Sequence, residues 1–307
     1  MRIAIVGAGG VGGYFGGRLA EAGADVVFLA RGPHLHALRT RGLRIVSPKG
    51  DAHITSINAT DDPAAIRGAD VVFFAVKLYD AEAASQVLPR LVESGGPETV
   101  VIPLQNGVEG TDIVSRAVGR DHTAGGTCYV SAVIAEPGVI THTAMDHLIF
   151  GEIDRVRSPR LMSLCDACRA ASFQSTLSDD IQADIWTKFV RLSAFSGMTA
   201  VTRSPIGTIV NDPDLFTLLQ KAVAEGMAVA QARGVHVPSS TVDDVAEAYR
   251  ALPPLAKASM LEDLERGRRL ELPWLSGAVV RIGQEVGVPT PTHGFISAVL
   301  KPHVNGS

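Results

Sequence analysis

A glycine motif directly behind a short apolar run constrains the fold of this chain more than any other feature. Residues 3–6 have the β-branched composition of a buried strand, and residues 7–12 carry the pattern G-x-G-x-x-G. Apolar residues at helical spacing follow from Tyr14 to Ala20, and residues 25–30 form a second strand pattern. The sequence therefore predicts a β-α-β unit of about thirty residues.

The glycines of this motif have different tasks in a dinucleotide-binding turn. Gly7 allows a tight turn, Gly9 allows the backbone to approach a pyrophosphate, and Gly12 allows close packing of helix on strand. The N-terminus of the following helix then meets the anion. A plain glycine-rich loop is the alternative, but the strand before the motif and the helix and strand after it favour dinucleotide binding.

The end of the second strand indicates which dinucleotide is bound. An acidic residue there would accept hydrogen bonds from the ribose 2′-hydroxyl of NAD, but the strand runs into Ala30, Arg31 and Gly32. A guanidinium can pair with a 2′-phosphate through two hydrogen bonds. Arg31 therefore favours NADP(H), with a solvated surface arginine as the alternative.

Two later strand patterns end in polar residues. Residues 68–77 end in Lys77, and residues 99–104 lead to Gln105 and Asn106. Ligands of open parallel sheets lie outside the carboxyl ends of the strands, so Lys77 and Asn106 are expected near the cofactor. The alternatives are a surface lysine and an ordinary Asn-Gly turn.

The rest of the chain changes character twice. Alternating apolar runs over residues 123–151, with Pro137 and Gly138 between two of them, predict hairpins that complete the parallel sheet. The pattern is then helical in residues 181–200, 214–233, 242–252, 256–267, 274–286 and 292–301. We therefore expect an α/β domain over residues 1–178 and an all-α domain over residues 179–307.

Composition excludes several classes of function. The 307 residues carry a formal charge of −4, which gives no electrostatic footprint for nucleic acid. No apolar run reaches about 18 residues, so neither a transmembrane helix nor a membrane partner is expected. The apolar start is too short for a secretion signal. Cys128, Cys165 and Cys168 are an odd number of cysteines, which is typical of a reducing cytoplasm.

The histidines and cysteines do not form a metal-binding pattern. His34 and His36 flank a predicted surface loop, and His142 and His147 lack the spacing of zinc ligands. The C-x-x-C of Cys165 and Cys168 has no second pair, which favours two structural thiols on a helix. No metal is expected.

A lysine interrupts an apolar helical stretch in the second half of the chain. Helical spacing places Lys188, Leu192, Ser196 and Thr199 on one uncharged face. An ammonium removed from water gives up its proton more readily, which suits a proton donor. A solvated helix lysine is the alternative.

Two further polar residues have ordinary interpretations when taken alone. Ser259 is followed three residues later by Glu262, as in a capping box that begins a helix. Glu271 lies between two leucines before Pro273, and its spacing by itself predicts a surface acid.

Together these residues resemble the 2-dehydropantoate 2-reductase (ketopantoate reductase) family, in order and over nearly the whole chain. The resemblance rests on the glycine motif of residues 7–12, Arg31, Ala75-Val76-Lys77, Gln105-Asn106-Gly107, Trp186-Thr187-Lys188-Phe189, Ser259-Met260-Leu261-Glu262-Asp263 and Glu271. It implies a Rossmann domain followed by a helical domain like the C-terminal domain of 6-phosphogluconate dehydrogenases. It also implies reduction of ketopantoate to pantoate with NADPH, in pantothenate and coenzyme A biosynthesis.

The resemblance assigns a role to each matched residue. Lys188 would be the general acid, and Glu271 would bind the substrate hydroxyl and hold Lys188 in place. Asn106 would contact cofactor and substrate, and Ser259 would bind the substrate carboxylate. The cofactor-binding residues would be Gly7, Ala8, Gly9, Gly10, Val11, Gly12, Arg31, Lys77, Asn106 and Ala132.

The chain departs from the family pattern where the family has three asparagines. Leu192, Ser196 and Ile206 stand at these positions, and of them Ser196 keeps a polar group for the substrate. Each hydrogen-bonding partner lost weakens a polar substrate by about 1–3 kcal/mol. A reductase of a different 2-oxo acid is therefore an alternative, and a non-catalytic NADP(H) sensor is another. A homodimer is possible, because helical domains of this kind can pair.

Overall fold

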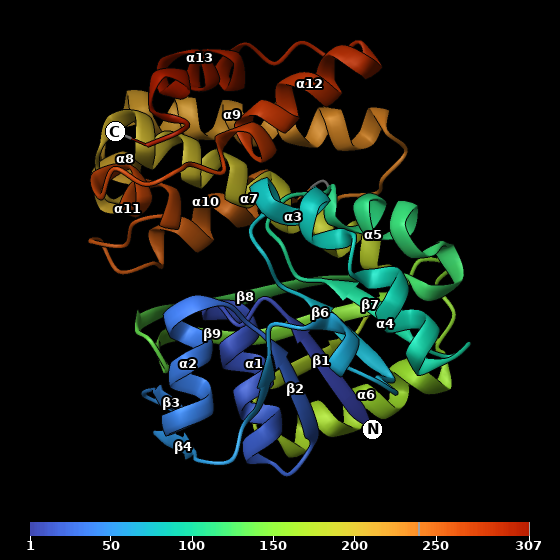
Figure 1. Ribbon diagram of the computed structural model, residues 1–307. Helices are drawn as coiled ribbons and strands as arrows, with labels where there is room; N and C mark the ends of the chain where they lie inside the picture. The colour runs from blue at the N-terminus through green and yellow to red at the C-terminus, as the bar shows by residue number, and fades with distance from the viewer. Residues whose placement is uncertain (239, 307) are drawn as a thin grey trace. The chain divides into compact units, whose positions relative to one another are not determined.

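The computed structural model describes residues 1–238 and 240–306, so Ser307, the last residue of the predicted second domain, lies outside the described residues. The chain forms two compact units. We call Met1–Gln105 with Glu109–Ile181 the sheet unit, and Asn106–Val108 with Gln182–Ser307 the helical unit. The predicted fold class, a parallel-sheet α/β domain followed by a helical domain, is confirmed (Figure 1).

A parallel sheet forms the core of the sheet unit, with the strand order β5-β2-β1-β6-β7. Its strands are β1 (Arg2–Val6), β2 (Asp25–Leu29), β5 (Asn58–Thr60), β6 (Val71–Phe74) and β7 (Val100–Pro103). All residues of β6 and β7 are buried, as expected for a sheet covered on both faces. The strand order reverses between β1 and β6, and ligands of such sheets bind at this point.

Helix α1 (Gly10–Glu21) packs against strands of two different sheets. A Cβ atom added at Gly16 would lie 2.7 Å from the Ile5 side chain of β1. One added at Gly17 would lie 2.7 Å from the side chain of Ile45, which belongs to the second sheet. The glycines of this helix therefore let both sheets approach its backbone.

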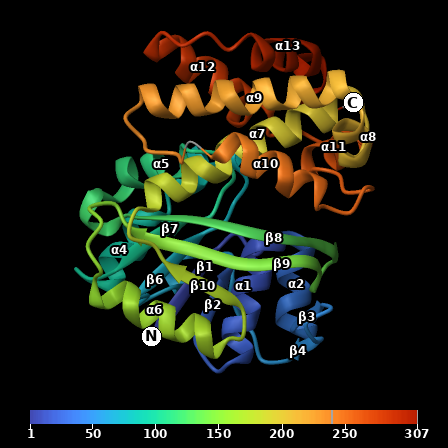
Figure 2. The same cartoon turned by 180° about the vertical axis from the view of Figure 1, so that it is seen from behind.

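The second sheet corrects the prediction that the hairpins complete the parallel sheet. It has the order β10-β9-β3-β4, and β8 also pairs with β9. Its strands are β3 (Leu43–Val46), β4 (Ala52–Ile54), β8 (Ala124–Glu136), β9 (Val139–Glu152) and β10 (Gln174–Leu177). Strands β8 and β9 form one long antiparallel hairpin, which turns at Pro137 and Gly138 as predicted (Figure 2). The hairpin joins a separate sheet because β3 and β10 both pair in parallel with β9.

Of the remaining helices of the sheet unit, the sequence pattern predicted only the one that carries Cys165 and Cys168. These helices are α2 (Gly32–Arg41), α3 (Leu78–Ser85), α4 (Leu88–Gly95), α5 (Gly110–Val118) and α6 (Pro159–Ala170), with the 3-10 turns η1 (Pro63–Ala65) and η2 (Arg120–His122). His34 and His36 lie within α2, so their predicted placement around a loop is wrong. The missed signal is Pro33 near the helix start, where its fixed φ suits a first turn.

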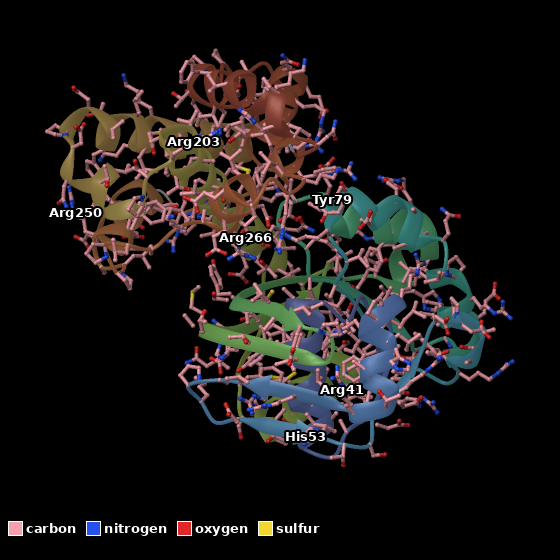
Figure 3. All side chains as sticks on the ribbon, turned by 60° about the vertical axis from the view of Figure 1, so that its left-hand side comes forward. Arg41, His53, Tyr79, Arg203, Arg250 and Arg266 are labelled. Atoms are coloured by element: carbon pink, nitrogen blue, oxygen red, sulfur yellow. The ribbon has the colours of Figure 1, made fainter. Side chains whose placement is uncertain are left out.

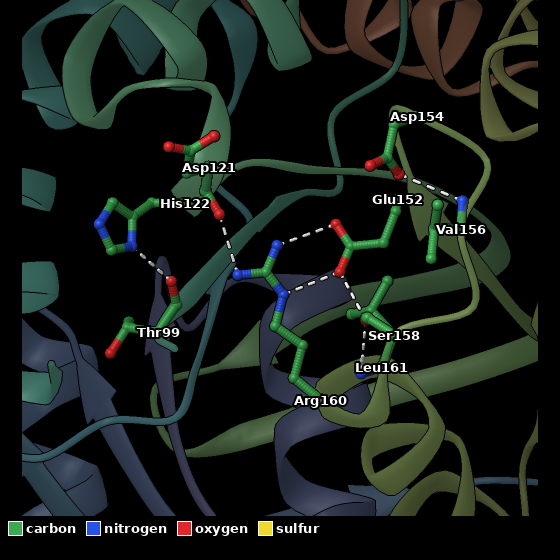
Figure 4. A network of polar contacts seen from close by, with 9 residues as sticks. All are labelled: Thr99, Asp121, His122, Glu152, Asp154, Val156, Ser158, Arg160 and Leu161. Carbon is green, nitrogen blue, oxygen red and sulfur yellow. Dashed lines mark hydrogen bonds and ion pairs between the residues drawn. The ribbon is translucent and has the colours of Figure 1, made fainter. Parts of the chain in front are cut away.

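A partly buried ion pair joins the end of β9 to the start of α6 (Figure 4). Arg160 donates to both carboxylate oxygens of Glu152, at 2.8 and 2.9 Å. Ser158, the N-cap of α6, donates to the same carboxylate at 2.6 Å and accepts from the N–H of Leu161. The hydrogen bonds to the Glu152 carboxylate hold the pKa of Arg160 above its ordinary value. We interpret this polar cluster as one that stabilises the sheet unit.

The helical unit has its own apolar core. Its helices are α7 (Ile181–Thr202), α8 (Ile206–Asn211), α9 (Pro213–Ala232), α10 (Thr241–Arg250), α11 (Ser259–Glu265), α12 (Ser276–Val286) and α13 (Pro291–Leu300), with the 3-10 turns η3 (Leu272–Trp274) and η4 (Lys301–His303). The guanidinium carbon of Arg250, a residue labelled in Figure 3, lies 4.3 Å from the ring centre of Phe216 on α9. Within residues 1–238 and 240–306, no helix has both the length and the apolarity needed to cross a membrane.

Candidate active site

The glycine motif forms the turn between β1 and α1, as predicted. Gly7 has φ +101°, a conformation that side chains other than glycine rarely adopt, and a Cβ there would lie 2.9 Å from Val76. Gly9 is the N-cap of α1 and provides no side-chain cap. The first N–H groups of a helix have no partner inside it, so this turn presents donors to an anion.

A cavity of about 440 Å³ opens beside this turn within the sheet unit. It is lined by Gly7, Ala8 and Gly9 after β1, by Arg31 after β2, and by residues of α3. The full set is Val6, Gly7, Ala8, Gly9, Leu29, Ala30, Arg31, His34, Val76, Asp80, Ala83, Ala84, Val87 and Ile134. A cavity at the carboxyl ends of β1 and β2, with backbone donors and one guanidinium, fits a dinucleotide.

Ala132 of β8 lies directly against the first turn of α1. A Cβ added at Gly10 would overlap its carbonyl oxygen. The β-ladder shifts register on both sides of Ser131, so Ala132 follows an irregularity of the hairpin. The structure therefore brings the backbone of Ala132 to the glycine motif, whereas Val11 and Gly12 pack toward the core.

The two predicted cationic residues have different positions. Arg31 is exposed, is the N-cap of α2 and lines the cavity. Lys77 is an exposed N-cap residue of α3 and is not among the residues that line the cavity, although its neighbour Val76 is.

His34 also lines this cavity, and the sequence pattern did not single it out as a site residue. Its Nδ1 accepts a hydrogen bond from the N–H of Gly138 at 3.1 Å. Burial lowers the pKa of His34 below its ordinary value, and the backbone of Ala8 opposes this shift only in part.

A second cluster of polar residues lies in the helical unit and centres on Lys188. This residue is only 8% exposed, so the interpretation as a solvated helix lysine is wrong. Its neighbours Phe189 and Val190 belong to the apolar core and fix this part of α7. The Lys188 Nζ donates to Oδ1 of Asn106 at 3.0 Å.

Glu271 completes this cluster, which we call the lysine cluster: Lys188, Asn106 and Glu271. Its carboxylate accepts from Nδ2 of Asn106 at 3.5 Å. Glu271 is 5% exposed, which corrects the surface position that its spacing alone predicts. Leu270 and Leu272 on either side are buried in the helical core, and they hold the acid inward.

The chemical character of the lysine cluster follows from the order of its members. The amide of Asn106 turns its oxygen toward a cation and its nitrogen toward a carboxylate, so each end of its dipole meets the opposite charge. Charge-assisted hydrogen bonds of this kind fix the direction of the Lys188 ammonium. A buried, oriented ammonium is suited to give a proton to a carbonyl oxygen.

Two further residues were predicted to bind the substrate, Ser196 and Ser259, and Ile206 was predicted to replace a family asparagine. Ser196 is fully buried on α7, and its hydroxyl has no hydrogen-bond partner. Ile206 is fully buried at the start of α8. Ser259 is exposed and is the first residue of α11, while Ala258 is the N-cap without a side-chain bond, so the capping box is wrong.

Neither metal-binding nor redox groups stand out in the described part of the chain. No group of three His, Cys, Asp or Glu side chains there could hold a metal ion. Cys165 and Cys168 are buried on α6, and burial raises the pKa of the Cys168 thiol far above its ordinary value. A thiol of this kind is inert.

The chain matches two family models. Residues 3–155 match the model described as Ketopantoate reductase PanE/ApbA. Residues 180–304 match the model described as Ketopantoate reductase PanE/ApbA C terminal. The two matches together cover most of both compact units.

Individual proteins resemble the chain over almost its whole length. A 2-dehydropantoate 2-reductase of Mesorhizobium japonicum is 31% identical, over 98% of this chain and 97% of that protein. The crystal structure of a PanE/ApbA family ketopantoate reductase from Ralstonia eutropha JMP134 has a TM-score of 0.89 and 30% identity, and covers 99% of this chain and 98% of its own. A D-mandelate dehydrogenase solved with NADH and anilino(oxo)acetate shares the fold, with a TM-score of 0.88 at 20% identity over 99% of this chain and 98% of its own.

Proposed function

The chain belongs to the ketopantoate reductase PanE/ApbA family of oxidoreductases, and from that premise we propose that it reduces 2-dehydropantoate to pantoate with NADPH. The observation that supports this proposal most strongly is the buried lysine cluster. Lys188 is held at 3.0 Å from Asn106, whose amide also reaches Glu271. These two hydrogen bonds support the proposal because they join an ammonium, an amide and a carboxylate, the polar groups that reduction of a carbonyl would use.

In the proposed reaction, bound NADPH supplies a hydride to the carbonyl carbon of the 2-oxo acid. Lys188 donates the proton that the carbonyl oxygen takes up, so a ketone becomes a secondary alcohol. Proton donation of this kind contributes about 10²–10⁴ in rate. Asn106 directs the ammonium, and Glu271 balances its charge and accepts a hydrogen bond from the substrate hydroxyl. Ser259 is proposed to bind the substrate carboxylate.

The residues of the sheet unit are proposed to hold the cofactor. The N–H groups at the start of α1 would bind the pyrophosphate, and Gly9 leaves space for its approach. Arg31 would pair with the 2′-phosphate, which favours NADPH over NADH. Ala132 and Lys77 would also contact the cofactor, as the family resemblance implies.

A second candidate is the reduction of a different 2-oxo acid. It is favoured by Leu192 and Ile206, apolar residues at positions where the family has asparagines. A pocket without these amides loses about 1–3 kcal/mol for each polar contact with ketopantoate. A less polar oxo acid would lose nothing there.

The test is oxidation of NADPH by the purified protein with a panel of 2-oxo acids led by ketopantoate. We expect turnover of ketopantoate with NADPH, much slower turnover with NADH, and loss of turnover in Lys188→Ala. Turnover of only a less polar oxo acid would support the second candidate. Tight NADPH binding with no turnover of any oxo acid would exclude both and favour a sensor.

A further inference from the structure

His34 occupies a position in the cofactor cavity that the proposed function does not use. It is the third residue of α2 and lines the same cavity as Gly7, Ala8 and Arg31. The ring therefore lies among the groups that are proposed to hold the phosphates of the dinucleotide.

The hydrogen bonding of the ring fixes which nitrogen carries the proton. The N–H of Gly138 donates to Nδ1, so Nδ1 must present its lone pair. In a neutral imidazole the other nitrogen then bears the hydrogen. This Nε2 atom is buried and completes no hydrogen bond in the described part of the chain, although the backbone of Ala8 lies close enough to the ring to raise its pKa. A buried donor without an acceptor is unfavourable, so the site is short of one acceptor.

The charge around the ring is compatible with a bound anion. Of the described residues that line the cavity, Arg31, His34 and Asp80 are ionisable. Arg41, at the far end of α2, donates to the carbonyl of Pro137 and is not among the residues that line the cavity. The glycine motif contributes backbone alone, and the backbone of Ala8 lies against the ring. The lining carries one arginine and one aspartate, so the attraction for an anion comes from Arg31 together with the backbone N–H groups at the start of α1.

We propose that the Nε2–H of His34 donates to a phosphate oxygen of the bound dinucleotide. This inference rests on the proposed cofactor site. The 2′-phosphate and the pyrophosphate offer the same acceptor chemistry, and both are expected close to the glycine motif and Arg31. His34 is thereby a cofactor-binding residue in addition to those that the family resemblance assigns.

Proton linkage follows from this contact. Burial keeps the pKa of the free ring below its ordinary value, and the Gly138 N–H also disfavours the imidazolium, because a protonated Nδ1 could no longer accept its hydrogen bond. A phosphate placed against Nε2 stabilises the imidazolium against both effects. Binding therefore takes up protons, and affinity increases as the pH falls from 8 to 6. Because a 2′-phosphate itself titrates near pH 6, the informative quantity is the difference between the wild type and a His34 variant.

Two variants distinguish the roles of the two ring nitrogens of His34. His34→Asn places a carbonyl oxygen where Nδ1 accepts from Gly138 but removes the Nε2 donor. His34→Gln places an amide N–H near Nε2 but cannot titrate. Dissociation constants for NADPH and NADH are measured by fluorescence titration at pH 6, 7 and 8, and proton uptake is measured by calorimetry in two buffers.

We expect His34→Asn to weaken NADPH binding by about tenfold and to abolish the extra proton uptake. His34→Gln should keep most of the affinity at pH 8 but lose the additional tightening at pH 6. A loss confined to NADPH assigns the contact to the 2′-phosphate, and an equal loss for NADH assigns it to the pyrophosphate.

Unchanged affinity and proton uptake in His34→Asn would overturn the inference and leave His34 as a support for the Gly138 turn. Failure of the proposed cofactor site looks different, because the wild type would then bind neither dinucleotide. Failure of the proposed reduction alone would leave NADPH binding, and its dependence on His34, intact. Thermal unfolding of His34→Asn should match the wild type, since the bond to Gly138 is kept.

Discussion

The cofactor cavity of the sheet unit and the lysine cluster of the helical unit present different kinds of atoms to their proposed ligands. At the cavity the donors are mainly backbone N–H groups, fixed by the turn from β1 to α1. In the lysine cluster the groups are three side chains from residues 106, 188 and 271, joined at 3.0 and 3.5 Å.

This difference determines how each region responds to substitution. A backbone site is sensitive to added atoms, because a new Cβ occupies the space of the ligand or of a neighbouring strand. A side-chain cluster is sensitive to removed atoms, because each member directs the next. The four predictions that follow test this contrast, from the largest expected effect to the smallest.

Lys188→Ala should lower kcat by about 10²–10⁴, because the proton donor is lost. The dissociation constant of NADPH should stay within about twofold of the wild-type value, as the glycine turn and Arg31 are intact. Stopped-flow reduction and a binding titration measure the two quantities. A large loss of NADPH affinity in this variant would contradict the separation of the two regions.

Gly10→Ala and Gly9→Ala form a matched pair in the backbone site. A Cβ at Gly10 would overlap the carbonyl oxygen of Ala132, so we expect the free energy of unfolding to fall by about 1–3 kcal/mol. A Cβ at Gly9 meets no protein atom within 4 Å, so stability should change by less than about 1 kcal/mol. Gly9→Ala should instead weaken NADPH binding by about tenfold or more, since its methyl group faces the pyrophosphate. Denaturant unfolding and binding titrations would refute this pairing if both variants lost stability equally.

Ser196→Ala tests whether the hydroxyl on α7 contacts the substrate. If it does, KM for the 2-oxo acid should rise by about tenfold, while removal of a buried, unpartnered hydroxyl should not lower stability. Ser193→Ala is the control, because that hydroxyl is equally buried and unpartnered on the same helix. Equal KM values for the wild type and both variants would remove Ser196 from the substrate site.

The stability of the helical unit should decrease in mild acid because of His293. Its Nε2 donates to the carbonyl of Ala222 at 2.9 Å, its Nδ1 has no partner, and the ring is fully buried. Burial lowers the pKa of His293, and the nearby Glu225 opposes this only in part. Below about pH 6.5 the unfolded chain therefore binds a proton that the folded chain does not, and stability falls until the lowered pKa is passed. Urea unfolding at pH 7.5 and 5.5 should show a smaller decrease in His293→Gln than in the wild type.

The two regions also differ in how far the sequence could predict them. The residues of the glycine motif and Arg31 are close together along the chain, and their strand and helix contexts are local, so the turn was predicted correctly. Glu271 was different, because its burial depends on Leu270 and Leu272 entering a core built by distant helices. Its spacing predicted a surface acid, and only the family resemblance marked it.

Long-range strand pairing and weak apolar periodicity explain the remaining errors. The hairpin of β8 and β9 was predicted from its alternating pattern and its Pro137-Gly138 turn, but its sheet was not, since that depends on β3 and β10. The short helix α2 has little apolar periodicity, with buried Leu35, Ala37 and Leu38 alone facing the core. His34 was therefore predicted beside a loop, and its position in the cavity was not predicted.

The assignment of Asn106–Val108 to the helical unit has a practical consequence for dissecting the protein. The polypeptide leaves the sheet unit after Gln105, rejoins it at Glu109 and leaves again after Ile181, so the units are interleaved in the chain rather than joined end to end. A fragment that begins after residue 178 would contain Lys188 and Glu271 but no amide between them. Two separately expressed halves would therefore have to fold and, in addition, bring residues 106–108 of the first half into the helical unit.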